Sequence, residues 1–105
     1  MVQLSEMIRD DGVCVVSVIG ELDLASVEEF STTARRSAAL CAALEVDLGA
    51  VSFIDSTGLS ALIKLREETG ARGVPLTLAN VSPATHRLLQ VTGLLDVFHI
   101  RAGSA

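Results

Sequence analysis

The chain has 105 residues, half of them apolar, with a net charge of −5 and neither Tyr nor Trp. This length fits one domain over residues 1–105, and the apolar content supplies a core, which excludes intrinsic disorder. The eight basic residues are scattered through an acidic chain that has no aromatic stacking platform, which argues against a nucleic-acid partner. The longest apolar stretch is about half of the ~20 residues that a membrane-spanning helix needs, which argues against a membrane span.

Two segments near the N-terminus are predicted to form a β-hairpin. Val2, Leu4 and Ile8 alternate with polar residues, as in a half-buried strand. Residues 13–19 are nearly all apolar and mostly β-branched, which is typical of a strand buried on both faces. The sequence Asp-Asp-Gly at 10–12 is a turn signal that joins the two strands.

The rest of the chain alternates between helices and strands. Ser26 with Glu29 three residues later is a capping box, which would open the first helix. Apolar spacing and turn signals predict, in chain order, a helix at 24–43, a strand at 44–48, an irregular apolar link at 49–54, a mostly buried helix at 57–69, a strand at 75–79, a helix from Ser82-Pro83 to Gly93 and a strand at 97–100. This order predicts an α/β fold with a mixed, mostly parallel sheet, antiparallel only at the first strand and packed with amphipathic helices.

The core and the cysteines follow from the same patterns. Cys14 and Cys41 show no Cys-x-x-Cys spacing and are expected to be reduced, apolar side chains, and the isolated His86 and His99 complete no metal-ligand set. No metal or cofactor is therefore expected, and the absence of a signal peptide favours the cytoplasm. The predicted core residues are Val15, Val16, Val18, Phe30, Val46, Leu48, Leu62, Ile63 and Leu89.

One segment, Phe53 to Leu59, joins a strand to the buried helix and is rich in polar residues. In the simplest interpretation Asp55 or Ser56 caps the helix and does nothing more. Three capping-type residues in a row exceed that need, and Gly58 costs ~1 kcal/mol in a helix, which favours close approach of another backbone. The sequence Asp-Ser-Thr-Gly at 55–58 differs from the Asp-Thr-Gly of aspartic proteases and has no second copy. The chain also has no nucleophile elbow with a placed base, no Walker motif and no dinucleotide fingerprint. We therefore expect no enzyme activity.

The motifs that stand out along the chain are Gly20-Glu21-Leu22-Asp23, then Val46-Asp47-Leu48 followed by Val51-Ser52-Phe53-Ile54-Asp55-Ser56-Thr57-Gly58-Leu59, and finally Val81-Ser82-Pro83 with Arg87-Leu88 and Gly93-Leu94. With these motifs the chain resembles the STAS domain family, and most of all the bacterial anti-anti-sigma factors, from the first hairpin to Phe98. The resemblance implies one mixed sheet with helices, in agreement with the pattern of elements.

The resemblance also implies a function. Members of this group, the anti-sigma factor antagonists, bind an anti-sigma factor that is also a serine kinase, and this binding frees the sigma factor. The kinase then phosphorylates a serine of the motif with ATP, the antagonist is released, and a metal-dependent serine phosphatase removes the phosphate. Residue by residue, Ser56 matches the phosphorylated serine. The implied partner-binding residues are Glu21, Asp23, Asp55, Ser56, Thr57, Gly58, Leu59 and Ser60.

Two further expectations accompany this assignment. Many relatives have Gly where this chain has Ser60, which bears on the fit of the partner and adds a second hydroxyl. Asp23 and Ser56 should lie near each other, because both follow the carboxyl ends of predicted parallel strands. The protein is expected to be a monomer or a weak dimer. The alternative function is that of a constitutive STAS subunit in a lipid-transport ATPase complex or a signalling scaffold.

Overall fold

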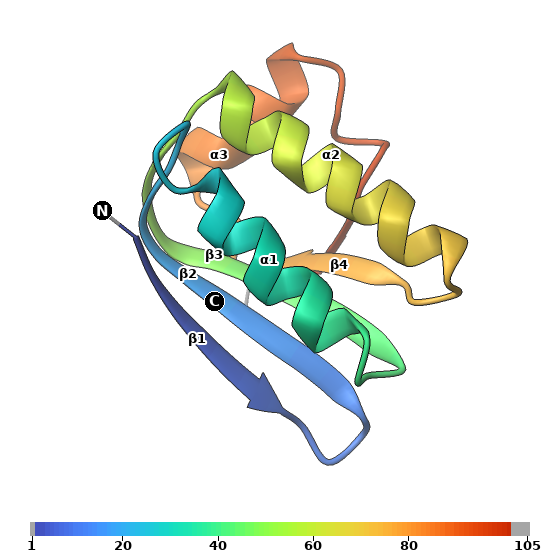
Figure 1. Cartoon of the computed structure of the whole chain (residues 1–105). Coiled ribbons are helices and arrows are strands. Elements are labelled where there is room, and N and C mark those ends of the chain that lie inside the picture. The colour runs from blue at the N-terminus through green and yellow to red at the C-terminus, as the bar shows by residue number, and fades with distance from the viewer. Residues whose placement is uncertain (1, 102–105) are drawn as a thin grey trace.

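Residues 2–101 are described by the computed structural model, in which three helices accompany a five-stranded sheet (Figure 1). The elements are β1 (Val2–Ile8), β2 (Val13–Leu22), α1 (Val27–Ala38), β3 (Ala43–Ile54), α2 (Ser56–Ala71), β4 (Leu76–Ala79), α3 (Pro83–Val91) and β5 (His99–Arg101). In this part of the chain no helix has the length and apolar character that a membrane span requires.

The strands lie in the sheet in the order in which they occur along the chain, β1-β2-β3-β4-β5. β1 pairs with β2 in the antiparallel sense, and every later pair is parallel. The predicted mixed sheet is therefore confirmed. α1 and α2 lie side by side across one face of this sheet (Figure 1).

The core fills the space between that face and the helices. Alternate strand residues, such as Val16 and Val46, point to the helices and are wholly buried together with Phe30 and Leu62. The predicted core is confirmed except for Ile63, which is half-buried. β2 is buried on both faces only in its first half, because further along Ile19 is 41% exposed.

The hairpin turn between β1 and β2 is fastened by Asp11. The backbone N–H of Val13 donates to Asp11 Oδ1 at 3.1 Å, and Arg9 also bonds to this carboxylate. These contacts, with the Val13 hydrogen bond as the largest, hold the pKa of Asp11 below its usual value. Gly12 completes the turn with a φ of 85°.

The face away from α1 and α2 carries a buried acid between two arginines. Glu45 is only 5% exposed although it is charged. Arg101 approaches it with two donors, Nε at 3.1 Å from Oε1 and Nη2 at 3.2 Å from Oε2, and Arg9 adds a third contact at 3.4 Å. This cluster ties the hairpin and the last strand to the centre of the sheet.

Two predicted boundaries are wrong. α1 covers only 27–38 of the predicted 24–43, because the chain makes a turn before Val27 and leaves the helix after Ala38 to enter β3. The predicted irregular link at 49–54 belongs to β3, because β2 pairs with it along its length, with register shifts between Ser17 and Ile19 and between Gly20 and Glu21.

The later elements lie close to their predicted positions. α2 extends the predicted helix at both ends and covers Ser56–Ala71. α3 begins as predicted, since the Ser82 side chain accepts from the N–H of Thr85 and Pro83 opens the helix. Gly93, with a φ of 74°, follows the last turn of α3. β4 starts one residue later than predicted, and β5 covers His99–Arg101 where 97–100 was predicted.

The cysteines differ from their prediction. The structure joins Cys14 of β2 to Cys41 in the segment between α1 and β3, with Cα atoms 5.8 Å apart. The separation of 27 positions hid this proximity, because parallel pairing of β2 with β3 brings the two positions together only in the folded chain.

Candidate functional site

The connections from β2 to α1 and from β3 to α2 lie at the same end of the sheet (Figure 1). Leu22 pairs with Ile54 in the last rung of the two parallel strands. Asp23 and Asp55 each follow that rung directly, so the segments that carry Asp23 and Ser56 are neighbours. The expected placement of these two segments is confirmed.

Gly58 allows this contact between the two connections. A Cβ atom at this position would overlap the backbone oxygen of Leu22 and would lie 2.8 Å from Cγ1 of Ile54. Real Cβ atoms essentially never come so close to other heavy atoms, so only glycine lets the first turn of α2 rest against the end of β2. The predicted close approach of another backbone is therefore present.

The turn at the start of α2 is capped by Asp55 and not by Ser56. Oδ1 of Asp55 accepts from the N–H of Gly58 at 3.0 Å, the standard arrangement at an N-cap. Ser56 is the first residue of α2 and is exposed. Within residues 2–101 its hydroxyl has no hydrogen-bond partner. The helix cap is thus complete without the Ser56 side chain.

The neighbouring acidic loop is held by its own hydrogen bonds. Asp23 Oδ1 accepts from the N–H of Ala25 at 3.1 Å. The buried Ser26 hydroxyl accepts from the N–H of Asp23 at 3.0 Å and donates to the carbonyl of Glu21 at 2.7 Å. The predicted capping box is wrong, because the Ser26 side chain makes no cap hydrogen bond to α1. Ser26 instead fixes the loop that presents Asp23.

Known proteins resemble this chain in sequence and in fold. The family model for the STAS domain matches residues 5–105. The chain belongs to the STAS domain family. An anti-sigma-B factor antagonist of Staphylococcus aureus is 34% identical over 92 residues, which cover 85% of this chain and 83% of the relative. A STAS-domain containing protein of Pseudomonas aeruginosa is 27% identical over 85 residues, 81% of this chain and 84% of the relative.

Solved structures agree with this assignment. The crystal structure of an anti-sigma factor antagonist from Mycobacterium paratuberculosis has a TM-score of 0.84 and 32% identity, covering 95% of this chain and 85% of that one. The structure of the anti-sigma factor antagonist SpoIIAA in its unphosphorylated form has a TM-score of 0.74 at 18% identity, covering 97% and 90%. The second likeness shows the shared fold.

Not every predicted site residue of this STAS domain is open to a partner. Glu21, Ser56 and Ser60 are exposed, and Asp23, Asp55 and Thr57 are half-buried. Gly58 and Leu59 are buried, the former against β2 and the latter in the core. The first helical turn points these two positions to the sheet, so Gly58 and Leu59 have structural roles in the free chain, and their partner contacts stay predictions.

Two apolar side chains near the serine turn were missed by sequence reasoning. Leu24, next to Asp23, is 76% exposed, and Phe53, two residues before Asp55, is 50% exposed. Leu24 lies in a segment predicted as helix, and Phe53 lies in a link predicted as irregular. Large apolar residues in such segments usually belong to the core, so the sequence offered no sign that these two are exposed. In the structure both are free to contact another protein.

Hollows flank the serine turn on two sides. One, of about 340 Å³, lies between α1 and α2 and includes Thr57, Ser60 and Lys64 in its lining. The other, of about 260 Å³, lies between the end of β3 and α3 and includes Phe53 and Leu88. Residues near Ser56 in the chain therefore border both hollows, Thr57 the first and Ile54 the second.

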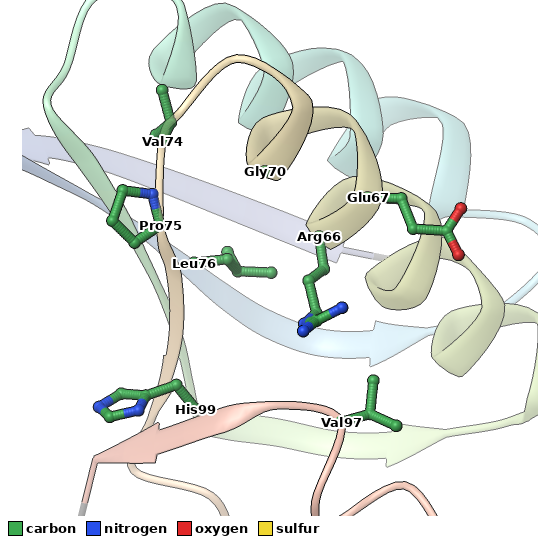
Figure 2. A pocket seen from close by; sticks show the side chains of 8 residues that line it. All are labelled: Arg66, Glu67, Gly70, Val74, Pro75, Leu76, Val97 and His99. Carbon is green, nitrogen blue, oxygen red and sulfur yellow. The ribbon is translucent and has the colours of Figure 1, made fainter.

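A third hollow, of about 390 Å³, lies toward the other end of α2 (Figure 2). Figure 2 shows Arg66 reaching from α2 into the space beside Val97, whereas Glu67 points away from it. None of the predicted site residues line this hollow. Among residues 2–101, no group of three His, Cys, Asp or Glu side chains could hold a metal ion.

Proposed function

We propose that this STAS domain is an anti-sigma factor antagonist that acts by partner switching. In this proposal the unphosphorylated chain binds an anti-sigma factor serine kinase through the serine turn and frees the sigma factor. The kinase then phosphorylates Ser56 with ATP and releases the chain, and a serine phosphatase restores the unmodified form. The relative from Staphylococcus aureus, named as an anti-sigma-B factor antagonist, supports the general role.

The observation that carries the proposal is the state of Ser56. The residue is exposed, its hydroxyl has no hydrogen-bond partner within residues 2–101, and Asp55 already caps the helix. A kinase can therefore reach the hydroxyl without breaking a structural contact. A phosphate at the first turn of a helix also faces the positive end of the helix dipole, which favours an anion there.

The surroundings of Ser56 explain why a phosphate would end binding. The group adds about −1.5 to −2 charges beside Asp23 and Asp55. A partner that covers this end of the sheet must desolvate that charge and make room for the phosphoryl group between the two flanking hollows. We infer that phosphorylation acts at the interface and leaves the fold intact.

The proposal includes an expected partner surface. Glu21, Asp23 and Asp55 give the docking end of the sheet an acidic character, while Leu24 and Phe53 add exposed apolar surface. A complementary partner presents basic side chains with apolar residues among them. The chain is proposed to work in the cytoplasm as a monomer or weak dimer.

The test uses anti-sigma factor kinases from the same genome, one at a time, with ATP and Mg²⁺. The unmodified chain should gain one phosphate, located by peptide mapping at Ser56. Ser56→Ala should bind the kinase, gain no phosphate and stay bound in the presence of ATP. The matched control is Ser5→Ala, which removes an exposed hydroxyl from β1, outside the residues assigned to partner binding, and should behave like the unmodified chain.

Ser56→Asp tests the mechanism of release. It should melt at the same temperature as the unmodified chain or slightly above it, while its binding to the kinase drops sharply. Loss of the folded state in Ser56→Asp would contradict release at the interface. Tight binding by Ser56→Asp, or phosphate in Ser56→Ala, would contradict the assignment of Ser56 and favour the constitutive subunit of a lipid-transport ATPase complex or scaffold.

A further inference from the structure

The two cysteines are brought together by backbone contacts that do not depend on their sulfur atoms. The N–H of Ala42 donates to the carbonyl of Gly12 at 3.2 Å, and Cys14 pairs with Leu44 in the parallel register of β2 and β3. The resulting Cα separation of 5.8 Å lies within the range of about 4.4–6.8 Å that disulfides require. The fold therefore presents the pair in a geometry in which a disulfide can form.

We propose that Cys14 and Cys41 are a reversible redox site, oxidised by a small-molecule disulfide such as glutathione disulfide. This site is separate from Ser56, and the proposal does not rest on the proposed function. Disulfides that form in this way inside cells are usually transient and redox-sensing.

The accessibility of the two cysteines sets the order of the reaction. Cys41 is half-buried in the segment between α1 and β3, whereas Cys14 is 3% exposed in β2. Cys41 is the thiol that a solvent-borne disulfide can reach, and Cys14 is the resolving thiol behind it.

The exchange balances without any other oxidant. The Cys41 thiolate attacks one sulfur of glutathione disulfide, forms a mixed disulfide and releases the first glutathione thiolate. The Cys14 thiolate then attacks the Cys41 sulfur and releases the second. Two protein thiols lose two electrons and two protons, and one glutathione disulfide becomes two glutathione thiols.

The bond would act on the part of the chain that carries the acidic loop. The loop closed by the disulfide spans 27 positions and contains both α1 and the turn with Asp23 and Ser26. Closing a loop of this size restricts the unfolded chain and stabilises the folded one. Oxidation should therefore raise the melting temperature by about 15 °C.

The test equilibrates the full chain in buffers of reduced and oxidised glutathione. Thiols are counted by alkylation under denaturing conditions and masses are recorded. The unmodified chain should show two thiols in reduced glutathione and none in oxidised glutathione, as a monomer without attached glutathione and with the higher melting temperature. Two titratable thiols in both buffers, or a disulfide-linked dimer, would overturn the proposal.

Single variants test the order of attack. Cys14→Ala, which keeps the buried position apolar, should leave Cys41 carrying one glutathione. Cys41→Ser should leave Cys14 as an unmodified thiol. Glutathione on Cys14 and none on Cys41 would overturn the assigned roles. If Cys14→Ala does not fold, an acid quench early in the oxidation of the unmodified chain traps the mixed disulfide, which peptide mapping should place on Cys41.

Discussion

Replacing Gly58 by alanine tests the contact that joins the two connections of the candidate site. The added Cβ would overlap the backbone oxygen of Leu22 and would lie 2.8 Å from Cγ1 of Ile54. Neither neighbour can rotate away as the end of a flexible side chain can, because the Leu22 oxygen belongs to a strand and Ile54 is buried. α2 must therefore shift away from β2.

Two opposing terms set the size of the effect. Alanine favours a helix over glycine by about 1 kcal/mol. Overpacking costs about 1–3 kcal/mol, and a clash with backbone belongs at the upper end of that range. We expect the Gly58→Ala variant to lose about 2 kcal/mol of unfolding free energy, which lowers its melting temperature by about 10 °C.

The control is the same substitution in the same helix at Gly70. A Cβ at Gly70 would meet no heavy atom within 4 Å, and the position borders the third hollow (Figure 2). Gly70→Ala should therefore gain up to about 1 kcal/mol from helix propensity alone. Urea unfolding of both variants should show opposite shifts of the midpoint at unchanged slope. A Gly58→Ala variant as stable as Gly70→Ala would refute the tight contact between α2 and β2.

Three other substitutions test the core, the cap and the ion cluster by urea unfolding. Leu62→Ala empties a wholly buried position and should cost about 2–5 kcal/mol; a cost below 1 kcal/mol would contradict its place in the core. Asp55→Ala removes the cap of α2 and should cost about 0.5–2 kcal/mol of unfolding free energy. Ser56→Ala should change the unfolding free energy by no more than about 0.5 kcal/mol. A larger loss in Ser56→Ala than in Asp55→Ala would identify Ser56 as the cap. Glu45→Gln weakens the paired contact with Arg101 and should cost about 1–2 kcal/mol; a variant as stable as the unmodified chain would show that this cluster is solvated.

Elements with complete local signals were predicted well. Ser82, Pro83 and Gly93 define the ends of α3 through bonds and backbone angles within a few residues, so neighbouring residues suffice to place them. The nearly continuous apolar run of β2 likewise predicts a strand whatever surrounds it. The parallel order of the sheet followed from the alternation of strands and helices, because short crossovers leave few other arrangements.

Elements that depend on distant partners were predicted poorly. The extension of β3 through 49–54 exists because β2 supplies hydrogen bonds to it, and the local sequence reads as an irregular link. The apolar spacing of α1 runs on beyond Ala38, but the chain leaves the helix and Cys41 meets Cys14. Periodicity records which residues avoid water and does not record which segment covers them.

The sequence by itself determined the fold class and the family motifs, and it singled out Ser56 as the proposed phosphorylation site, since these depend on residue types at short spacing. The tertiary structure decided what each motif residue can do. Asp55 caps α2, Leu59 enters the core, Gly58 meets the end of β2, and Ser56 remains exposed. The physical reason is the first turn of α2, which points adjacent residues in different directions, and only the docking of that turn on the sheet selects which of them faces water.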